Sequence, residues 1–385
     1  MIAKILIPIL LVVFLTHLYF DLTFLRRLRR WKRLLCWLVP VAASGYVLSM
    51  AFLPNYFPRS VTLLSVFMAF LVCGVVPLAL IALFSCLARW LKRRFFAFVG
   101  WGLAVVVIVV YAYGSLVGFY EFEVRRVEIA FDDLPPAFDG YRIVQFSDVH
   151  LGTLTGRRHA ILERLVDSIN AQKADIVVFT GDLQNMHPDE IVPDTALLSR
   201  LEATDGVCSV LGNHDGSFYV DGDYVDKAIN EERTIGLQQD MGWRVLVNSR
   251  RYLYRGQDSI VMAGMANDGE GRFPANGNIN NALWNVNRNQ FVVMLEHDPT
   301  SWRRKILRSS HTQLTLSGHT HSAQFSLFGW SPAAFRYREY DGLYEIAGRY
   351  LFVSKGVGGV IPFRFGAKGE IVVITLRSKQ SSPKS

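Results

Sequence analysis

The chain has 385 residues, of which 51% are hydrophobic, and a formal net charge of +8. This length allows two folded units, and the charge is divided unevenly: residues 1–120 hold 12 of the 41 basic side chains and one of the 33 acidic ones. Residues 121–385 are therefore slightly acidic, which argues against the broad basic surface of a nucleic-acid-binding protein.

Residues 1–120 contain long apolar segments that are typical of membrane spans. Three runs have no charged side chain: Leu34–Leu53, Val61–Ala88 and Phe95–Tyr120, with 20, 28 and 26 residues. A helix needs about 20 such residues to cross a bilayer. Ile5–Phe20 is a fourth candidate, and we interpret it as a retained helix, because it lacks the cleavage pattern of a signal peptide and further spans follow it. We therefore expect a membrane domain of four transmembrane helices at 1–120.

The basic residues predict how these helices are oriented. Six basic residues lie between the first and second spans and four between the third and fourth, whereas Arg59 alone lies between the second and third. Short loops rich in Lys and Arg stay in the cytoplasm. We therefore expect a multi-pass protein of the cytoplasmic membrane with both termini outside, so that residues 121–385 are extracytoplasmic (periplasmic in a bacterium).

Residues 141–377 alternate between strand and helix patterns, which predicts a second, α/β domain. We expect 121–140 to be a linker, 378–385 to be a disordered tail, and the Asn- and Gly-rich segment Asn267–Asn289 to be a long loop. Periodic apolar spacing predicts helices at Arg158–Ala171 and Asp189–Leu201. The expected strands are Arg142–Phe146, Asp175–Thr180, Gly206–Leu211, Arg244–Val247, Ser259–Met265, Phe291–Leu295, Gln313–Leu316, Tyr350–Ser354 and Ile371–Leu376.

Polar side chains follow five of these expected strands. They are Asp148, His150, Asp182, Asn213, His214, Asp215, His297, His319 and His321. In α/β sheets, ligands bind at the carboxyl ends of the strands, so we expect these side chains to converge. In an extended backbone, the two outer side chains of Asp-x-His or His-x-His point the same way and can reach one centre. Imidazole, carboxylate and amide oxygen together suit divalent metal ions, and two such ions would attract a phosphate group.

The segments FSDVHLG, TGDL, LGNHD, LEHDP and SGHTH, in this order, resemble the calcineurin-like metallophosphoesterase superfamily. The resemblance covers residues 140–376 and implies a four-layer α/β/β/α sandwich that binds two divalent metal ions. The implied ligands are Asp148, His150 and His321 for the first ion, Asn213, His297 and His319 for the second, and Asp182 as the bridge. The resemblance also implies that His214 is the catalytic histidine, oriented by Asp215, and that the nucleophile is a metal-bound hydroxide.

Within the superfamily, the chain is most similar to a membrane-anchored or exported bacterial branch. The segments Gly342–Tyr344 and Leu351–Gly366 carry this similarity. The chain has Asn185 where that branch has Asp, and Ser322-Ala323-Gln324 where the branch has Gly-Gly-Gln. Neither position is an implied metal ligand, so these departures bear on how the substrate fits.

We interpret the chain as a dinuclear phosphohydrolase that cleaves phosphoesters at the outer face of the membrane, with lipid-linked phosphates as one substrate class. Manganese, iron, zinc and magnesium all remain open as the metal. The alternative enzyme resembles the UDP-2,3-diacylglucosamine pyrophosphatase of lipid A synthesis, whose substrate is cytoplasmic. A non-catalytic membrane scaffold is a further alternative. A transporter is disfavoured, because the second to fourth spans have no charged residue.

Overall fold

The computed structural model describes residues 2–52, 61–217, 219, 224–271 and 273–379. The expected end of the second span at Leu53, Arg59 after it and most of the C-terminal tail lie outside this range. The chain divides into two compact units, Met1–Ser115 and Leu116–Ser385.

The first unit is helical. Its helices are α1 (Ile2–Phe20), α2 (Arg30–Phe52), α4 (Val61–Phe70), α5 (Val76–Trp90) and α6 (Phe95–Leu116), the last of which ends just beyond the unit. Among the described residues, three segments are long and apolar enough to cross a membrane: Pro8–Leu25, Val61–Trp90 and Phe95–Tyr120. The expected second span, Leu34–Leu53 in α2, is not among them over the described residues.

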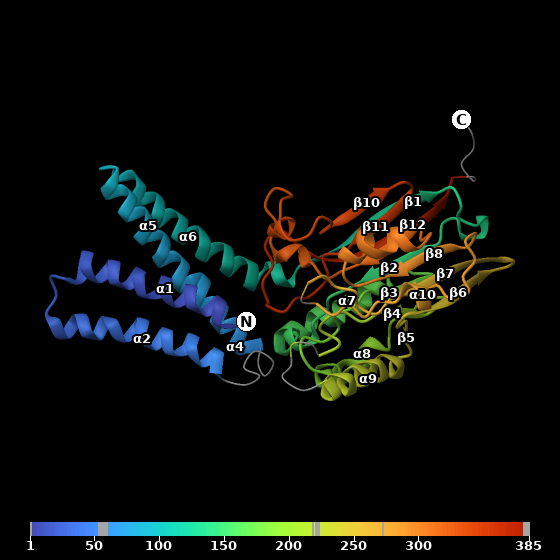
Figure 1. Ribbon diagram of the computed structural model, residues 1–385, viewed down its shortest axis with the longest axis horizontal. Helices are drawn as coiled ribbons and strands as arrows, with labels where there is room; N and C mark the ends of the chain where they lie inside the picture. The colour runs from blue at the N-terminus through green and yellow to red at the C-terminus, as the bar shows by residue number, and fades with distance from the viewer. Residues whose placement is uncertain (1, 53–60, 218, 220–223, 272, 380–385) are drawn as a thin grey trace. The chain divides into compact units, whose positions relative to one another are not determined.

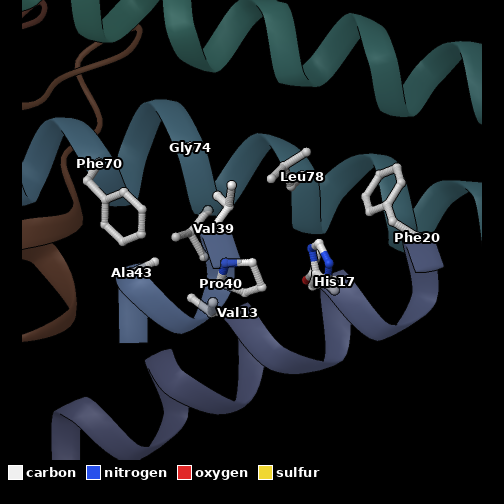
Figure 2. A pocket seen from close by; sticks show the side chains of 11 residues that line it. Val13, His17, Phe20, Val39, Pro40, Ala43, Phe70, Gly74 and Leu78 are labelled. Carbon is white, nitrogen blue, oxygen red and sulfur yellow. The ribbon is translucent and has the colours of Figure 1, made fainter. Parts of the chain in front are cut away.

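Helices α1, α2 and α5, together with the π-helical turn Leu71–Val75, line an apolar cavity of about 180 Å³. Figure 2 shows the rings of His17 and Phe20 from α1 facing Pro40 of α2 and Leu78 of α5. The His17 ring also lies edge-on to Trp37, with ring centroids 4.6 Å apart. The cavity is thus walled almost entirely by carbon, with the imidazole as its main polar group.

The second unit is built on two six-stranded sheets, with strand orders β1-β12-β2-β3-β4-β5 and β10-β11-β9-β8-β7-β6. The strands of the first sheet are β1 (Phe122–Phe131), β2 (Arg142–Phe146), β3 (Ile176–Phe179), β4 (Val207–Ser209), β5 (Arg244–Val245) and β12 (Gly369–Ser378). Those of the second are β6 (Ser249–Arg255), β7 (Asp258–Gly264), β8 (Phe291–Leu295), β9 (Leu314–Ser317), β10 (Gly342–Ile346) and β11 (Arg349–Val353). Strands β2, β3 and β4 are parallel neighbours, as are β8 and β9, so their carboxyl ends share an edge within each sheet.

The two sheets pack face to face over a common apolar core. Ile143 and Val178 of the first sheet share this core with Val293 and Leu316 of the second. The other face of the first sheet is covered by α7 (His159–Asn170), and that of the second by α10 (Ile279–Ala282) and the turns around Trp302. Figure 1 shows the green and orange strands stacked between these helices. Strands β3 and β8 are buried at every position, which explains why their sequences are continuous apolar runs.

Two sequence predictions about local structure are wrong. The expected linker forms β1, which pairs in parallel with β12 along its whole length. The expected helix Asp189–Leu201 is broken into two 3₁₀ turns and the short helix α8 (Thr195–Leu198), because Pro193 lacks the N–H that a continuous helix needs. Helix α9 (Tyr224–Asp240) and strands β6 and β10 have no counterpart among the predicted elements.

Candidate metal centre

Seven of the predicted site residues lie at the carboxyl ends of five strands, as expected. Two groups have donor atoms within 4.8 Å of one another: Asp148, His150, Asp182 and His321 form one, and Asp182, His297 and His319 form the other. Asp182 belongs to both groups. All these side chains are buried except for the edge of His321, so the structure concentrates two carboxylates and four imidazoles in a space largely closed to water.

The backbone at these residues is strained in a way that turns the side chains inward. Five of the predicted ligands have positive φ, between 49° and 74°: Asp148, His150, Asp182, His319 and His321. The left-handed conformation costs a non-glycine residue about 1–2 kcal/mol, and such residues concentrate at functional sites. The Asp-x-His and His-x-His segments are therefore not extended, and their side chains converge from left-handed backbone conformations.

Glycines next to the ligands allow this crowding. A Cβ on Gly212 would collide with the carboxylate of Asp182, and one on Gly318 would collide with Asp148 and Ser147. These glycines belong to the segments LGNHD and SGHTH, and the close approach of their backbones to the carboxylates requires the absence of a side chain. The same approach lets the His319 N–H donate to both oxygens of Asp148 at 3.1 Å.

The first group places two imidazole nitrogens and a carboxylate around one point. His150 Nε2 lies 3.2 Å from His321 Nε2, and His321 Nε2 lies 3.3 Å from Asp148 Oδ1. His150 Nε2 is 3.7 Å from Asp182 Oδ2. Burial lowers the pKa of His150 to about 3 and that of His321 well below its ordinary value. Neutral imidazoles whose lone pairs converge with carboxylate oxygens are the donor set that a divalent cation requires.

The second group is centred on His297. Its Nε2 lies 3.2 Å from Asp182 Oδ2 and 3.2 Å from Asn213 Oδ1, and 3.3 Å from His319 Nδ1. Burial lowers the pKa of His297, but the Asp182 carboxylate outweighs this and raises it to about 10. Without a cation, the proton on His297 thus neutralises Asp182, and a bound metal would replace that proton.

The outer atoms of these ligands are held by second partners. The His297 Nδ1–H donates to the Thr180 carbonyl at 2.7 Å, which turns Nε2 toward Asp182. His319 Nε2 lies 3.0 Å from the Tyr337 hydroxyl, which leaves Nδ1 facing the site. Asn213 Nδ2 donates to the Tyr219 hydroxyl at 2.9 Å, which fixes Oδ1 toward His297. Partners of this kind orient metal ligands in proteins, so the residues present fit two divalent ions.

The predicted pairing of His214 with Asp215 is wrong. The Nδ1–H of His214 donates to the main-chain carbonyl of Asn185 at 2.5 Å. The Asp215 carboxylate instead accepts the backbone N–H groups of Asp182, Leu183 and Gly212, at 2.7, 2.9 and 2.8 Å. These donors lie in the turns after β3 and β4, so Asp215 holds together the two loops that carry Asp182 and Asn213.

Comparison with known proteins agrees with this site. A family model described as calcineurin-like phosphoesterase matches residues 141–323. A transmembrane protein with metallophosphoesterase domain from Danio rerio is 30% identical over 369 residues, which cover 89% of this chain and 80% of the relative. The chain belongs to the calcineurin-like metallophosphoesterase family. An uncharacterized metallophosphoesterase of Bacillus subtilis (strain 168), YkuE, is 31% identical over 259 residues, or 64% of this chain and 82% of the relative.

Three aromatic residues at the centre of this metallophosphoesterase carry contacts that the sequence did not assign. Tyr337 contacts His319, and the ring of Phe273 lies edge-on to it with centroids 4.9 Å apart. Tyr219 lies against His214, with the ring centroids 4.4 Å apart, and its hydroxyl accepts a hydrogen bond from Asn213. No local sequence pattern marks Tyr337 or Phe273, since both lie in irregular segments away from the five motifs.

Trp284 lines a surface pocket with Arg288 and His311, apart from the metal centre. The two departures from the branch pattern, Asn185 and Ser322, are both buried. Asn185 supplies the carbonyl that holds His214, so this departure is in direct contact with the candidate catalytic histidine.

Proposed function

We propose that this protein is a dinuclear metal-dependent phosphohydrolase that cleaves phosphoesters at the outer face of a membrane. The observation that carries the proposal is the pair of overlapping ligand groups that share Asp182. A carboxylate common to two ligand sets can bridge two ions, and paired ions stabilise the attacking and leaving oxygens of a phosphoryl displacement. The packed sheets and their helices support the four-layer sandwich expected from the sequence.

In this proposal, Asp148, His150 and His321 would hold one ion, Asn213, His297 and His319 would hold the other, and Asp182 would be shared by both. When bound, the two ions lower the pKa of water and neutralise charge on the phosphoryl group. The mixed nitrogen and oxygen ligands suit manganese, iron, zinc and magnesium alike. The proposal therefore names divalent metal ions as a class.

His214 would act on the leaving oxygen. Its Nδ1 is committed to the Asn185 carbonyl, so Nε2 is the atom from which it can deliver a proton. The ring packs against His150 at a centroid distance of 4.7 Å, which places it beside the first ligand group. The ring of Tyr219, tilted by 35° and with its centroid 4.4 Å away, lies against His214 and restricts its rotation.

The test is to measure metal content and hydrolysis together in the purified full chain. We expect Asp182→Asn to lose bound metal and activity in parallel, because a neutral amide cannot bridge two cations. The control is Asp194→Asn, which changes a buried carboxylate that contacts His159 outside the site. We expect this control to keep both metal and activity. Hydrolysis that survives in a metal-free Asp182→Asn protein would overturn the proposal.

A separate assay tests whether His214 is catalytic. We expect His214→Gln to keep both metals, since His214 belongs to neither ligand group. Its kcat should fall by about 10²–10⁴, the usual contribution of general acid–base catalysis. Full activity with both metals bound would assign the proton transfer to another group. A chain that binds metal but hydrolyses no phosphoester at all would favour the scaffold alternative.

We further propose that residues 1–120 anchor the protein through four spans with both termini outside, followed by the catalytic domain at 141–377. The three apolar helical segments and the relative named as a transmembrane protein support membrane association. The charge of the connecting loops supports the orientation. A C-terminal reporter fusion tests it: activity of a periplasmic reporter is expected, and activity of a cytoplasmic reporter alone would revive the UDP-diacylglucosamine alternative.

The proposed substrate class is a phosphoester carried at the membrane surface, such as a phospholipid or a polyprenyl phosphate. Multiple spans exceed what tethering requires, which favours a substrate that also resides in the bilayer. Parallel assays with lipid-linked and soluble phosphoesters test this point. A preference for soluble nucleotides would exclude lipid-linked substrates and leave the phosphohydrolase activity intact.

A further inference from the structure

The segment 326–336 lies between β9 and β10 in the catalytic unit (Figure 1), and several of its large apolar side chains are exposed. Leu327, Phe328, Trp330 and Phe335 are 46%, 101%, 46% and 84% exposed. Single exposed apolar residues are common on protein surfaces, but a concentration of them indicates an interaction site. We call this segment the apolar turn.

The tip of the apolar turn has a conformation that an aromatic residue does not favour. Leu327 and Trp330 exchange backbone hydrogen bonds at 2.8 and 3.1 Å and enclose Phe328 and Gly329. Both enclosed residues have positive φ, at 52° and 80°, and Asn-Gly is the usual sequence for such a turn. Because Phe328 is fully exposed, packing against the described residues of the catalytic unit does not offset this conformational cost. A contact outside the catalytic unit would offset it.

The base of the apolar turn is fastened to the metal centre. Ser326 N–H donates to the Phe365 carbonyl at 2.7 Å, and the Ser331 hydroxyl donates to the carbonyl of Ser322 at 2.6 Å. Ser322 directly follows the candidate ligand His321. Whatever surface the tip contacts is therefore held at a fixed position relative to the first ligand group.

We propose that the apolar turn inserts into the lipid interface of the membrane that anchors this chain. Tryptophan, phenylalanine and leucine are the side chains that enter this interface. Trp330 and Phe335 form an edge-on pair, with centroids 5.6 Å apart, that presents one wide apolar surface. Arg338, two residues beyond the apolar turn, lies 3.8 Å from Glu339 and is 76% exposed, so it adds a cation that suits anionic headgroups.

The connectivity of the chain favours the bilayer over another protein as the partner of the apolar turn. The candidate span Phe95–Tyr120 is followed almost immediately by β1, which begins at Phe122. A connection this short keeps the lipid surface at a high effective concentration around the catalytic unit. Insertion of the apolar turn would hold the ligand group at His321 beside the headgroups. This inference concerns docking and does not depend on the proposed hydrolysis.

The experiment measures lipid contact at the tip in the full chain reconstituted in nanodiscs. Phe328→Cys is labelled with a nitrobenzoxadiazole fluorophore, and the nanodiscs carry nitroxide-labelled phospholipid as the quencher. The matched control is Val225→Cys on α9, a position that is 60% exposed. The signal of the chain without an added cysteine is subtracted, since it keeps the four native cysteines.

We expect the label at residue 328 to be quenched at least twofold more strongly than the label at residue 225, with emission at shorter wavelength. Equal quenching at the two positions would overturn the proposal. A shift to shorter wavelength that lacks lipid quenching and grows with protein concentration would also overturn it, and would assign the apolar turn to contact with a second copy of the chain.

A second variant reports the consequence for catalysis. We expect Phe328→Ser combined with Phe335→Ser to lose at least fivefold in hydrolysis of a phospholipid in nanodiscs, with unchanged hydrolysis of the soluble ester bis(p-nitrophenyl) phosphate. An equal loss on both substrates would mean that the substitutions damage the site and would contradict the docking role. If the unsubstituted chain hydrolyses neither substrate, the proposed function fails, and the quenching experiment still decides the docking.

Discussion

The imidazole of His214 is held by the main chain of Asn185 and not by the carboxylate of its neighbour Asp215. The hydrogen bond from Nδ1–H to the Asn185 carbonyl measures 2.5 Å, whereas Asp215 accepts four backbone N–H groups at 2.7–3.3 Å. This arrangement separates the candidate acid from the residue that organises the loops around it. It also means that the two residues should respond differently to substitution.

We expect Asp215→Asn to destabilise the catalytic unit more than it impairs chemistry. The amide can keep one accepting oxygen but turns N–H groups toward buried donors, at a cost of about 3 kcal/mol. A loss of this size lowers the midpoint of thermal unfolding by roughly 6–12 °C in a domain of about 250 residues. Scanning fluorimetry of the full chain in detergent measures this shift.

The catalytic readout for the same variant is kcat for molecules that retain both metals. We expect it to fall less than tenfold, far less than in His214→Gln. A loss in Asp215→Asn as large as in His214→Gln, with stability unchanged, would restore Asp215 as the residue that orients the histidine.

We expect Tyr337→Phe to weaken one of the two metal sites about tenfold, the lower range for removing a group that orients a ligand. The hydroxyl lies 3.0 Å from His319 Nε2 and helps to direct Nδ1 toward His297. Titration with a chelator, followed by metal analysis, should show one ion leaving early. Tyr252→Phe is the matched control, because its hydroxyl contacts only the Asn285 carbonyl on the surface, at 3.4 Å. Identical chelator curves for the two variants would contradict this role.

We expect Arg364→Met to destabilise the loop beside the first ligand group by about 3 kcal/mol, because several buried carbonyls would lose their donors. The buried guanidinium donates to the carbonyls of Lys355, Gly358 and Ala367, at 2.8, 2.7–3.0 and 2.9 Å. The measurement is again the thermal midpoint. The control is Arg200→Met, at an exposed arginine. Its thermal midpoint should shift by an amount that corresponds to less than about 0.5 kcal/mol in the free energy of unfolding. Equal midpoints for the two variants would refute the prediction.

Alkaline pH should expose the contribution of Tyr141 to stability. Burial raises the pKa of this phenol, and so does its hydrogen bond to Asp205 Oδ2, at 2.6 Å. Because the pKa is higher in the folded than in the unfolded chain, this contribution is complete below about pH 10, the ordinary pKa of tyrosine, and is lost as the pH rises above it. The difference in unfolding midpoint between the wild type and Tyr141→Phe should therefore shrink above pH 10. A difference that grows there would contradict the sign.

Local sequence patterns were sufficient where a strand is short, buried and apolar. Strands β2 and β8 have the predicted bounds, because runs such as Phe291–Leu295 are apolar at every position. Strand β1 was missed because Glu123, Arg125 and Arg126 interrupt its apolar residues. Such a strand is stable only at the edge of a sheet, beside a partner as distant in sequence as β12. The pairing, and not the local pattern, makes it a strand.

The candidate site follows the same division. The sequence by itself determined which side chains are available, because each metal-binding residue type directly follows a buried strand and needs no distant partner to be recognised. Only the tertiary structure decided how they combine: His150 with His321, Asn213 with Tyr219, and His214 with the carbonyl of Asn185. These contacts depend on the order of the strands in the two sheets and on the left-handed turns that follow the strands. Both are features of the folded unit, in which the two sheets bury a common core.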